Sequence, residues 1–381
     1  MHIERVDLAD AEAIRACHAV SLAADRADEP QGPWITERPF SGWMTVGWGG
    51  EPREAWLVRD QAEGAAGGMR TGPAGRVTGW YRLELPDREN RDRSYLNLVV
   101  HPEERRRGLG LALLRHATGR AMAHQRAVIS GAARNGTPGE AFARSTGAEP
   151  GVIEVQRVLE LGQLADGRLA RLREQAERAA AGYSLVSWTG PVPDEFIERA
   201  AALYAALSDA PHDPGEEPEI WDARRVREAN DRLPCYGTRD YSVAAVKRDG
   251  EVVGGGTGEL AALTVMIVDP ADPGWGHQAI TAVTREHRGH RLGLLVKVTM
   301  LELLAAPEPQ LERIDTWNGE SNAHMIAVNE ALGFTIVGPP ITSWRLDVAA
   351  VPVGPGTDQL ELAGPGPGGP GPGGPGLSVP G

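Results

Sequence analysis

Residues 95–121 read Tyr-Leu-Asn-Leu-Val-Val-His-Pro-Glu-Glu-Arg-Arg-Arg-Gly-Leu-Gly-Leu-Ala-Leu-Leu-Arg-His-Ala-Thr-Gly-Arg-Ala, and this stretch decides the fold. The apolar run from Leu96 to Val100 has the length of an internal strand, and a proline soon ends it. Leucine and alanine then recur at helical spacing from Leu109 to Ala121, which predicts a helix with one apolar face. Gly108 and Gly110 carry no Cβ, so a ligand can approach the free N–H groups of the first helical turn. Together the three elements predict a binding site for a phosphate.

The same pattern returns in the second half of the chain. Ala279 to Val283 predicts a second strand, and Arg288-Gly-His-Arg-Leu-Gly293 predicts a second turn before an apolar helix. Gly293 lies 183 residues after Gly110, and the glycines that close a later helix in each copy, at positions 147 and 333, lie 186 residues apart. Because the two pairs of glycines are separated by nearly the same number of residues, the sequence predicts an internal repeat of a whole domain.

Two motifs carry a family resemblance. Arg105-x-x-Gly108-x-Gly110 resembles the R/Q-x-x-G-x-G/A signature of the GNAT superfamily of N-acetyltransferases, whose turn holds the pyrophosphate of acetyl-coenzyme A. The second copy keeps Arg288 and Gly293 in register, but Arg291 stands where the first glycine belongs. The run Asn322-Ala-His-Met-Ile-Ala-Val-Asn-Glu-Ala-Leu-Gly-Phe334 resembles the closing L-Y-E-K-L-G-F pattern of the family. The resemblance covers residues 1–353.

This resemblance implies an α/β (mixed α+β) protein with two tandem GNAT domains, each a central mixed and splayed β-sheet flanked by helices. We expect the first domain over residues 1–162, a linking helix over 163–182 and the second domain over 183–353. Residues 354–381 consist of Gly-Pro repeats with few apolar side chains, which predicts a disordered tail.

Composition limits the function classes. A chain of 381 residues with 41% hydrophobic and 24% charged residues is long enough for two cores. Its formal net charge of -13 argues against nucleic acid as a partner and fits a small cationic molecule better. Two cysteines, Cys17 and Cys235, cannot build a disulfide framework, which favours a reducing compartment. Since no signal core or membrane-spanning run occurs, we expect a cytoplasmic protein that contacts no membrane, as a monomer or homodimer. His287 and His290 lack cysteines or carboxylates at ligand spacing, so we expect no metal.

The resemblance implies that acetyl-coenzyme A is the cosubstrate. In the family, the pantetheine arm lies between two splayed parallel strands, and a backbone N–H of the signature strand polarises the acetyl carbonyl. The implied binding residues of the first half are Leu98, Val99, Val100, Arg105, Arg107, Gly108, Leu109, Gly110 and Leu111. Those of the second half are Thr281, Ala282, Val283, Arg288, Gly289, Arg291, Leu292, Gly293 and Asn322.

The base and the acid are expected in the second half. Family members often place a carboxylate base at the start of the signature strand, and counting back six residues gives His277 in the second half and Ser94 in the first. Only the histidine titrates near working pH, although it could also be satisfied by a carbonyl, and Glu259 is a competing base. The tyrosine that the family commonly uses as the acid is replaced by Ala143 and Asn329. Asn329 can hydrogen-bond the cofactor sulfur or pantetheine but is a poor acid, so water is the alternative proton source.

An acidic segment points to the acceptor. Asp209 to Asp222 carries six carboxylates in fourteen residues, which is interpreted either as a solvated loop or as a lid that attracts a cationic acceptor. The sequence therefore favours transfer of an acetyl group from acetyl-coenzyme A to a primary amine of a small-molecule acceptor by direct attack. The alternative is a coenzyme A-binding regulatory protein without turnover.

Overall fold

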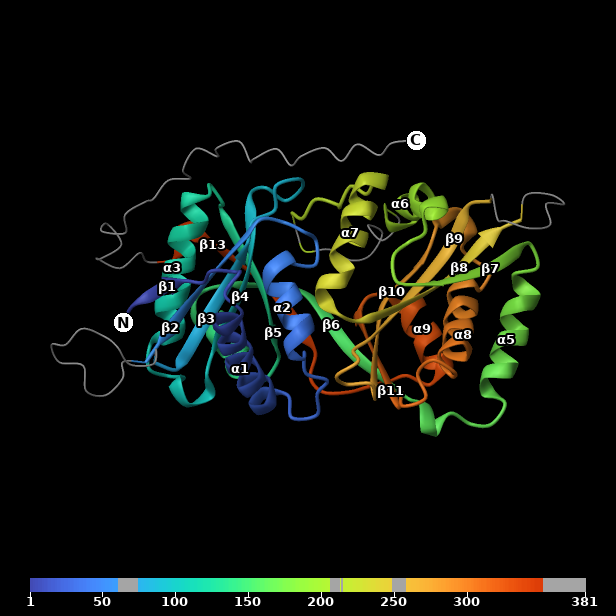
Figure 1. Cartoon of the computed structure of the whole chain (residues 1–381), viewed down its shortest axis with the longest axis horizontal. Helices are drawn as coiled ribbons and strands as arrows, with labels where there is room; N and C mark the ends of the chain where they lie inside the picture. Colours follow the sequence, from blue (N-terminus) through green and yellow to red (C-terminus); the bar gives the residue numbers. More distant parts are fainter. Residues whose placement is uncertain (61–74, 206–212, 214, 249–257, 352–381) are drawn as a thin grey trace, which may run out of the picture.

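The computed structural model describes residues 1–60, 75–205, 213, 215–248 and 258–351, and the tail expected over 354–381 lies outside them. The strands of the first half are β1 (Ile3–Arg5), β2 (Arg53–Arg59), β3 (Val77–Glu84), β4 (Arg93–Val100), β5 (Val128–Arg134) and β6 (Glu149–Glu160). Those of the second half are β7 (Tyr183–Thr189), β8 (Arg239–Lys247), β9 (Leu260–Val268), β10 (Trp275–Val283), β11 (Arg313–Gly319), β12 (Thr335–Ile336) and β13 (Ile341–Asp347). They form one sheet in the order β1-β2-β3-β4-β5-β13-β6-β11-β10-β9-β8-β7, with β12 paired to β6 (Figure 1).

The two halves exchange their last long strands. β13, from the second half, pairs antiparallel with β5 of the first half over its whole length. β6, from the first half, pairs antiparallel with β11 of the second half from Glu154 to Glu160. β6 and β13 also pair with each other, so hydrogen bonds run without a break from one half to the other. This exchange covers the edges of β5 and β11, which would otherwise present unpaired N–H and C=O groups. The predicted domain limits stay predictions.

Helices cover both faces of the sheet. The helices are α1 (Ala11–Asp28), α2 (Glu37–Val46), α3 (Leu109–Ala123), α4 (Pro138–Ser145), α5 (Arg168–Ala179), α6 (Ile197–Ala205), α7 (Ala223–Tyr236), α8 (Leu292–Leu304) and α9 (Ala323–Leu332). In the first half α1 and α2 pack on one face around Phe40 and Trp80, and α3 packs on the other around Tyr81 and Leu113. In the second half α6 and α7 share one core, and α5, α8 and α9 share another. The expected mixed α/β class with helices flanking a splayed sheet is confirmed.

The halves also meet through α2 and α7. Gly42 of α2 lies so close to α7 that a Cβ on it would come within 2.7 Å of the Cys235 carbonyl oxygen. Only glycine permits this approach of the two backbones. Figure 1 shows α7 in the middle of the molecule, between the helices of the two halves.

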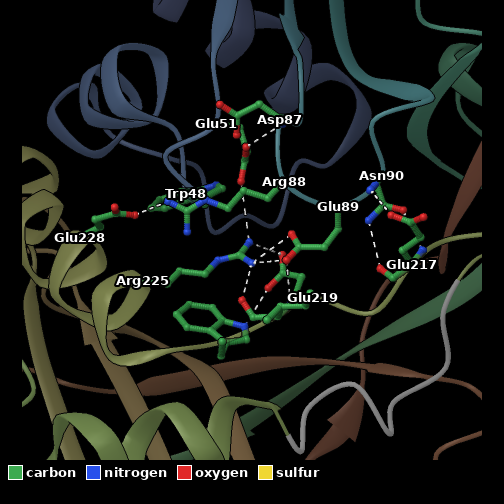
Figure 2. Close-up of polar contacts among 12 residues, drawn as sticks. Trp48, Glu51, Asp87, Arg88, Glu89, Asn90, Glu217, Glu219, Arg225 and Glu228 are labelled. Atoms are coloured by element: carbon green, nitrogen blue, oxygen red, sulfur yellow. Dashed lines mark hydrogen bonds and ion pairs between the residues drawn. The ribbon is translucent and has the colours of Figure 1, made fainter.

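The described part of the acidic segment docks on the first half. Asn90 and Glu217 exchange three hydrogen bonds of 2.8 to 3.1 Å, two of them through backbone N–H groups. Glu216 accepts a hydrogen bond of 3.0 Å from Tyr95 Oη and lies 3.3 Å from the buried Arg93 guanidinium. Neither interpretation of this segment, as a solvated loop or as a lid, included these contacts with the first half. Figure 2 shows Asn90 facing Glu217 across the junction.

A buried arginine occupies the centre of this junction. Arg225 of α7 is 3% exposed, and its guanidinium lies 3.1 Å from Glu89, 3.5 Å from Glu219 and 3.7 Å from Glu51 (Figure 2). Burial raises the pKa of Glu51 above its ordinary value, although the Asp87 backbone N–H and Arg225 oppose the shift. Since two of these carboxylates come from the first half and the arginine from the second, the cluster ties the halves electrostatically.

Candidate active site

The first-half turn has the backbone that a phosphate site requires. β4 ends at Val100, a short 3-10 turn follows at Pro102–Glu104, and α3 begins after Gly108. Gly108 has a φ of 81°, in the left-handed region that favours glycine. A Cβ on Gly110 would lie 3.5 Å from Phe142, in ordinary contact, so a much larger side chain here would meet Phe142 and Val100. The first N–H groups of α3 lack helical partners and can bind an anion.

The arginines of this turn are engaged by carboxylates. Arg105 donates two hydrogen bonds, of 2.7 and 2.8 Å, to the carboxylate of Asp28 and a third to the Val100 carbonyl oxygen. Arg107 is largely exposed and donates to Glu104 at 2.7 Å. Arg105 therefore fastens the turn to the end of α1.

A large cavity opens where β4 and β5 separate. The two parallel strands pair only from Arg93 to Tyr95 and diverge beyond that point. The resulting cavity has a volume of about 930 Å³ and is bounded by β4, β5, the glycine turn, α4 and the end of α1. Of the predicted first-half residues, it is lined by Leu98, Val99, Val100, Arg105, Gly108, Gly110 and Leu111. Arg107 is exposed and Leu109 is buried in the core beneath α3.

Three carboxylates at the end of α1 face this cavity, and sequence reasoning missed them. Asp25, Asp28 and Glu29 all line it. Burial raises the pKa of Asp25 to about 6, helped by Glu29 and Asp28 and opposed by Arg134 and Arg105. Burial also raises the pKa of Glu29, although its ion pair with Arg134 opposes the shift. Their spacing of one helical turn was visible in the sequence, but their arginine partners are distant in the chain.

A second cavity adjoins the first between the halves. It has a volume of about 400 Å³ and shares Asp28, Glu29 and Arg134 with the larger one. Its far wall includes Trp275 at the start of β10 and Arg313 at the start of β11. A molecule in the second cavity would therefore contact both halves of the chain.

The second-half turn keeps the backbone shape but contacts a helix. Arg291, at the place of Gly108, has a φ of 54° and precedes α8 as Gly108 precedes α3. Arg291 donates to Gln175 at 3.2 Å and His290 lies 3.3 Å from the Ala179 carbonyl oxygen, so two side chains of the turn engage α5.

His277 lies where β10 and β11 begin to separate. The two parallel strands pair only from Trp275 to His277, so His277 is the last residue of β10 that pairs with β11. Its Nδ1 lies 2.9 Å from Asp315 Oδ1, and the side chain is 46% exposed. The second carboxylate oxygen of Asp315 accepts a hydrogen bond of 3.0 Å from Gln156.

The first-half counterpart of His277 is Tyr95, which corrects the count that gave Ser94. The last paired residue of β4 is Tyr95, whereas Ser94 corresponds to Gly276. β10 contains a bulge between Gln278 and Ile280, and β4 pairs with β3 without a register shift. The bulge adds one residue, so counting back from the strand ends does not give equivalent positions.

Glu259 lies away from His277. It immediately precedes β9, near the end where Ala262 pairs with Val283, whereas His277 pairs with Ile267 toward the other end. Its carboxylate lies 3.2 Å from His287 Nε2, and Tyr183 Oη lies 3.0 Å from the other ring nitrogen of that histidine.

A buried lysine lies between β10 and α9 in the second half. Lys297 of α8 is 2% exposed, and its ammonium donates to Gln278 Oε1 at 2.6 Å and Asn329 Oδ1 at 2.7 Å. Asn329 in turn donates to Asn318 of β11 at 2.7 Å. Burial lowers the pKa of Lys297 to about 7. Asn322 caps α9 by accepting from the Met325 N–H at 3.2 Å.

The corresponding first-half positions hold small or apolar side chains. Leu114 occupies the place of Lys297, counted from the starts of α3 and α8, and Ala133 that of Asn318, counted from the paired strands. Ala143 occupies the place of Asn329, because the carbonyl oxygens of both accept the backbone N–H of the residue after the closing glycine. Leu114 and Ala133 line the large cavity. At these three positions the first half has apolar side chains where the second half has polar ones. This difference explains why the first half has a cavity where side-chain hydrogen bonds cross the second half.

Comparisons with known proteins agree with this geometry. Residues 22–147 match the model of the acetyltransferase (GNAT) family. A solved tandem GNAT protein from the clavulanic acid biosynthesis pathway, without acetyl-coenzyme A, is 27% identical, with a TM-score of 0.69 over 91% of this chain and 98% of that chain. A GCN5-related N-acetyltransferase from Sphaerobacter thermophilus is 17% identical, with a TM-score of 0.57 over 91% of this chain and 95% of that chain. A comparison with curated proteins finds no match.

No group of three or more His, Cys, Asp or Glu side chains in the described part of the chain is placed to hold a metal ion. None of the described helices is long and apolar enough to cross a membrane.

Proposed function

We propose that the chain is a tandem-domain acyltransferase of the GNAT superfamily and that it transfers an acetyl group from acetyl-coenzyme A to a primary amine of a small cationic acceptor. The observation that carries this proposal is the 930 Å³ cavity, because the signature turn and the splayed strands β4 and β5 line it together. The pyrophosphate fits the N–H groups of α3, and the pantetheine arm fits the gap beside Leu98 to Val100. An N–H of that strand would polarise the acetyl carbonyl.

Acetyl-coenzyme A binds in the first half under this proposal. In the second half, the bonds from Lys297 to Gln278 and Asn329 cross the equivalent space, and α5 contacts the turn. The predicted second-half cofactor residues, from Thr281 to Gly293 and at Asn322, remain a prediction that a binding stoichiometry of two would support.

His277 remains a candidate base. Its hydrogen bond through Nδ1 to Asp315 would leave Nε2 to accept a proton from an amine. Such a base is useful only if a thioester reaches the second half, because a base must lie within hydrogen-bond reach of the proton it removes. The role of His277 therefore depends on cofactor binding in that half.

A regulatory protein without turnover is the second candidate. Ala143 and Asn329 replace the tyrosine acid in both halves, and Asn329 is engaged by Lys297. This candidate keeps acetyl-coenzyme A binding but predicts no release of thiol.

Calorimetry and a thiol assay test the proposal. Titration with acetyl-coenzyme A should give one site per chain, lost in Gly110→Trp, whose indole fills the cavity, and kept in the matched variant Gly293→Trp. Release of free coenzyme A should occur with one or more members of a panel of primary amines. Absence of binding in the wild type would refute the proposal, and binding without thiol release for any amine would favour the regulatory candidate.

A further inference from the structure

The end of α1 places three carboxylates in the cofactor cavity, and two of them are neutralised. Asp28 accepts two hydrogen bonds from Arg105, and Glu29 forms an ion pair with Arg134. Asp25 lines the same cavity one helical turn earlier, and among the described residues its carboxylate has no hydrogen-bond or ion-pair partner. The cavity thus holds one carboxylate whose lone pairs are free.

The position of Asp25 is electrostatically unfavourable. It lies in the last turn of α1, where the helix dipole disfavours negative charge. The charged groups that face it are Glu29 and Asp28 on its own helix, Arg134 on β5 and Arg105 in the turn. Burial is the main reason why the pKa of Asp25 rises to about 6, and the two neighbouring carboxylates add to the shift. Such a group gives up and takes back a proton near neutral pH, as a general base must.

The signature strand also lines this cavity. Asn97 to Val100 of β4 line it together with Asp25. Under the proposed function, the thioester of acetyl-coenzyme A lies along this strand. The adjoining 400 Å³ cavity shares Asp28, Glu29 and Arg134 with the cofactor cavity and offers room for the acceptor. We propose that Asp25 is the base that removes a proton from the acceptor amine during acetyl transfer in the first half.

Proton transfer in this step involves only the acceptor, Asp25, the coenzyme A thiolate and water. The acceptor enters as an ammonium ion and gives one proton to the Asp25 carboxylate. The neutral amine attacks the acetyl carbonyl carbon, a C–N bond forms, and the C–S bond breaks. The thiolate of coenzyme A takes the second amine proton through water, because no side chain at the place of the family tyrosine can donate it. Asp25 finally releases its proton to solvent.

This inference rests on the proposed function and differs from the His277 prediction in its location. His277 belongs to β10 of the second half and lines neither of the two cavities. Asp28 and Glu29 are less suited as bases, because their carboxylates are held by Arg105 and Arg134. Asp25 is thus the carboxylate of the cofactor cavity that is free to accept a proton.

The experiment compares four variants of the full-length protein with the best amine from the panel. Asp25→Asn should lower kcat by roughly 10²–10⁴-fold and remove the fall of kcat/KM below pH 6, while calorimetry gives an unchanged Kd for acetyl-coenzyme A. Asp25→Glu should recover part of the rate, because it restores a carboxylate. Glu12→Gln, which removes an exposed carboxylate at the far end of α1, should match the wild type. His277→Ala tests the competing base of the second half.

Each outcome decides the proposal. Wild-type kinetics in Asp25→Asn, with the acidic limb intact, would overturn the role of Asp25 while leaving the acetyltransferase function standing. A loss confined to His277→Ala would move the base to the second half. No turnover by the wild type with any amine would refute the proposed function, and the role of Asp25 with it.

Discussion

Lys297 lies inside the second half without a carboxylate within ion-pair distance among the described residues. Because burial disfavours its ammonium form, the pKa of Lys297 is about 7 in the folded state and near 10.5 in the unfolded chain. Between these values the unfolded chain binds more protons, so this residue adds stability as pH rises from 7 toward 10.5. The melting temperature of the wild type relative to Lys297→Met should therefore rise across this range. Thermal scans in a pH series measure this difference in melting temperature. The same pH dependence in the two proteins would contradict the lowered pKa of Lys297.

Asp25 changes the stability with pH in the opposite direction. Its pKa is about 6 in the folded state and near 3.8 in the unfolded chain, so the folded state binds more protons between these values and loses stability as pH rises through them. Asp25→Asn should consequently raise the melting temperature at pH 7.5, by roughly 2–4 °C for each kcal/mol gained, and have less effect at pH 4. Greater stability with lower activity is typical of an active-site group. An equal effect at both pH values would show that Asp25 ionises normally.

Single residues also show where the sequence was sufficient. Gly108 could be recognised because a left-handed turn before a helix is specified locally, and the structure gives it a φ of 81°. Asp25 could not, because its importance depends on Arg105 and Arg134 having other carboxylates as partners, and those pairs join residues 77 and 105 positions apart. The bulge in β10 was equally hidden, so Tyr95 was not recognised as the counterpart of His277.

At the scale of elements, α7 and the segment before it hold the halves together through Arg225. Arg225→Met removes the cation that faces Glu51, Glu89 and Glu219, and leaves buried carboxylates unpaired. We expect a loss of about 3–5 kcal/mol in the free energy of unfolding, measured by chemical denaturation. The neighbouring Arg224 provides the control, since its ion pair with Glu228 is exposed and Arg224→Met should cost less than about 1 kcal/mol. Equal effects of the two substitutions would contradict a structural role for the buried cluster.

The whole molecule differs from two domains joined in series. The sequence predicted the repeat, because each half carries its own strand, turn and helix signals. It could not predict the exchange of β6 and β13, because the partner of a last strand lies far away in the chain and its sequence does not specify which half it pairs with. Only the complete pairing of the sheet decides between the two arrangements.

The exchange predicts that neither half folds well alone. Residues 1–162 without β13 leave the edge of β5 uncovered and β6 without β11, and residues 163–353 lack the strand that pairs with β11. Each separate fragment should therefore aggregate or unfold without a cooperative transition, because uncovered strand edges and apolar faces remain exposed. Coexpression of the two fragments should restore a soluble one-to-one complex with a single cooperative melting transition and the affinity of the intact chain for acetyl-coenzyme A. Size-exclusion chromatography, circular dichroism and calorimetry test these outcomes. A fragment 1–162 that is monomeric, melts cooperatively and binds acetyl-coenzyme A would show that the first half is autonomous, and that the strand from the second half completes the sheet without being needed for the site.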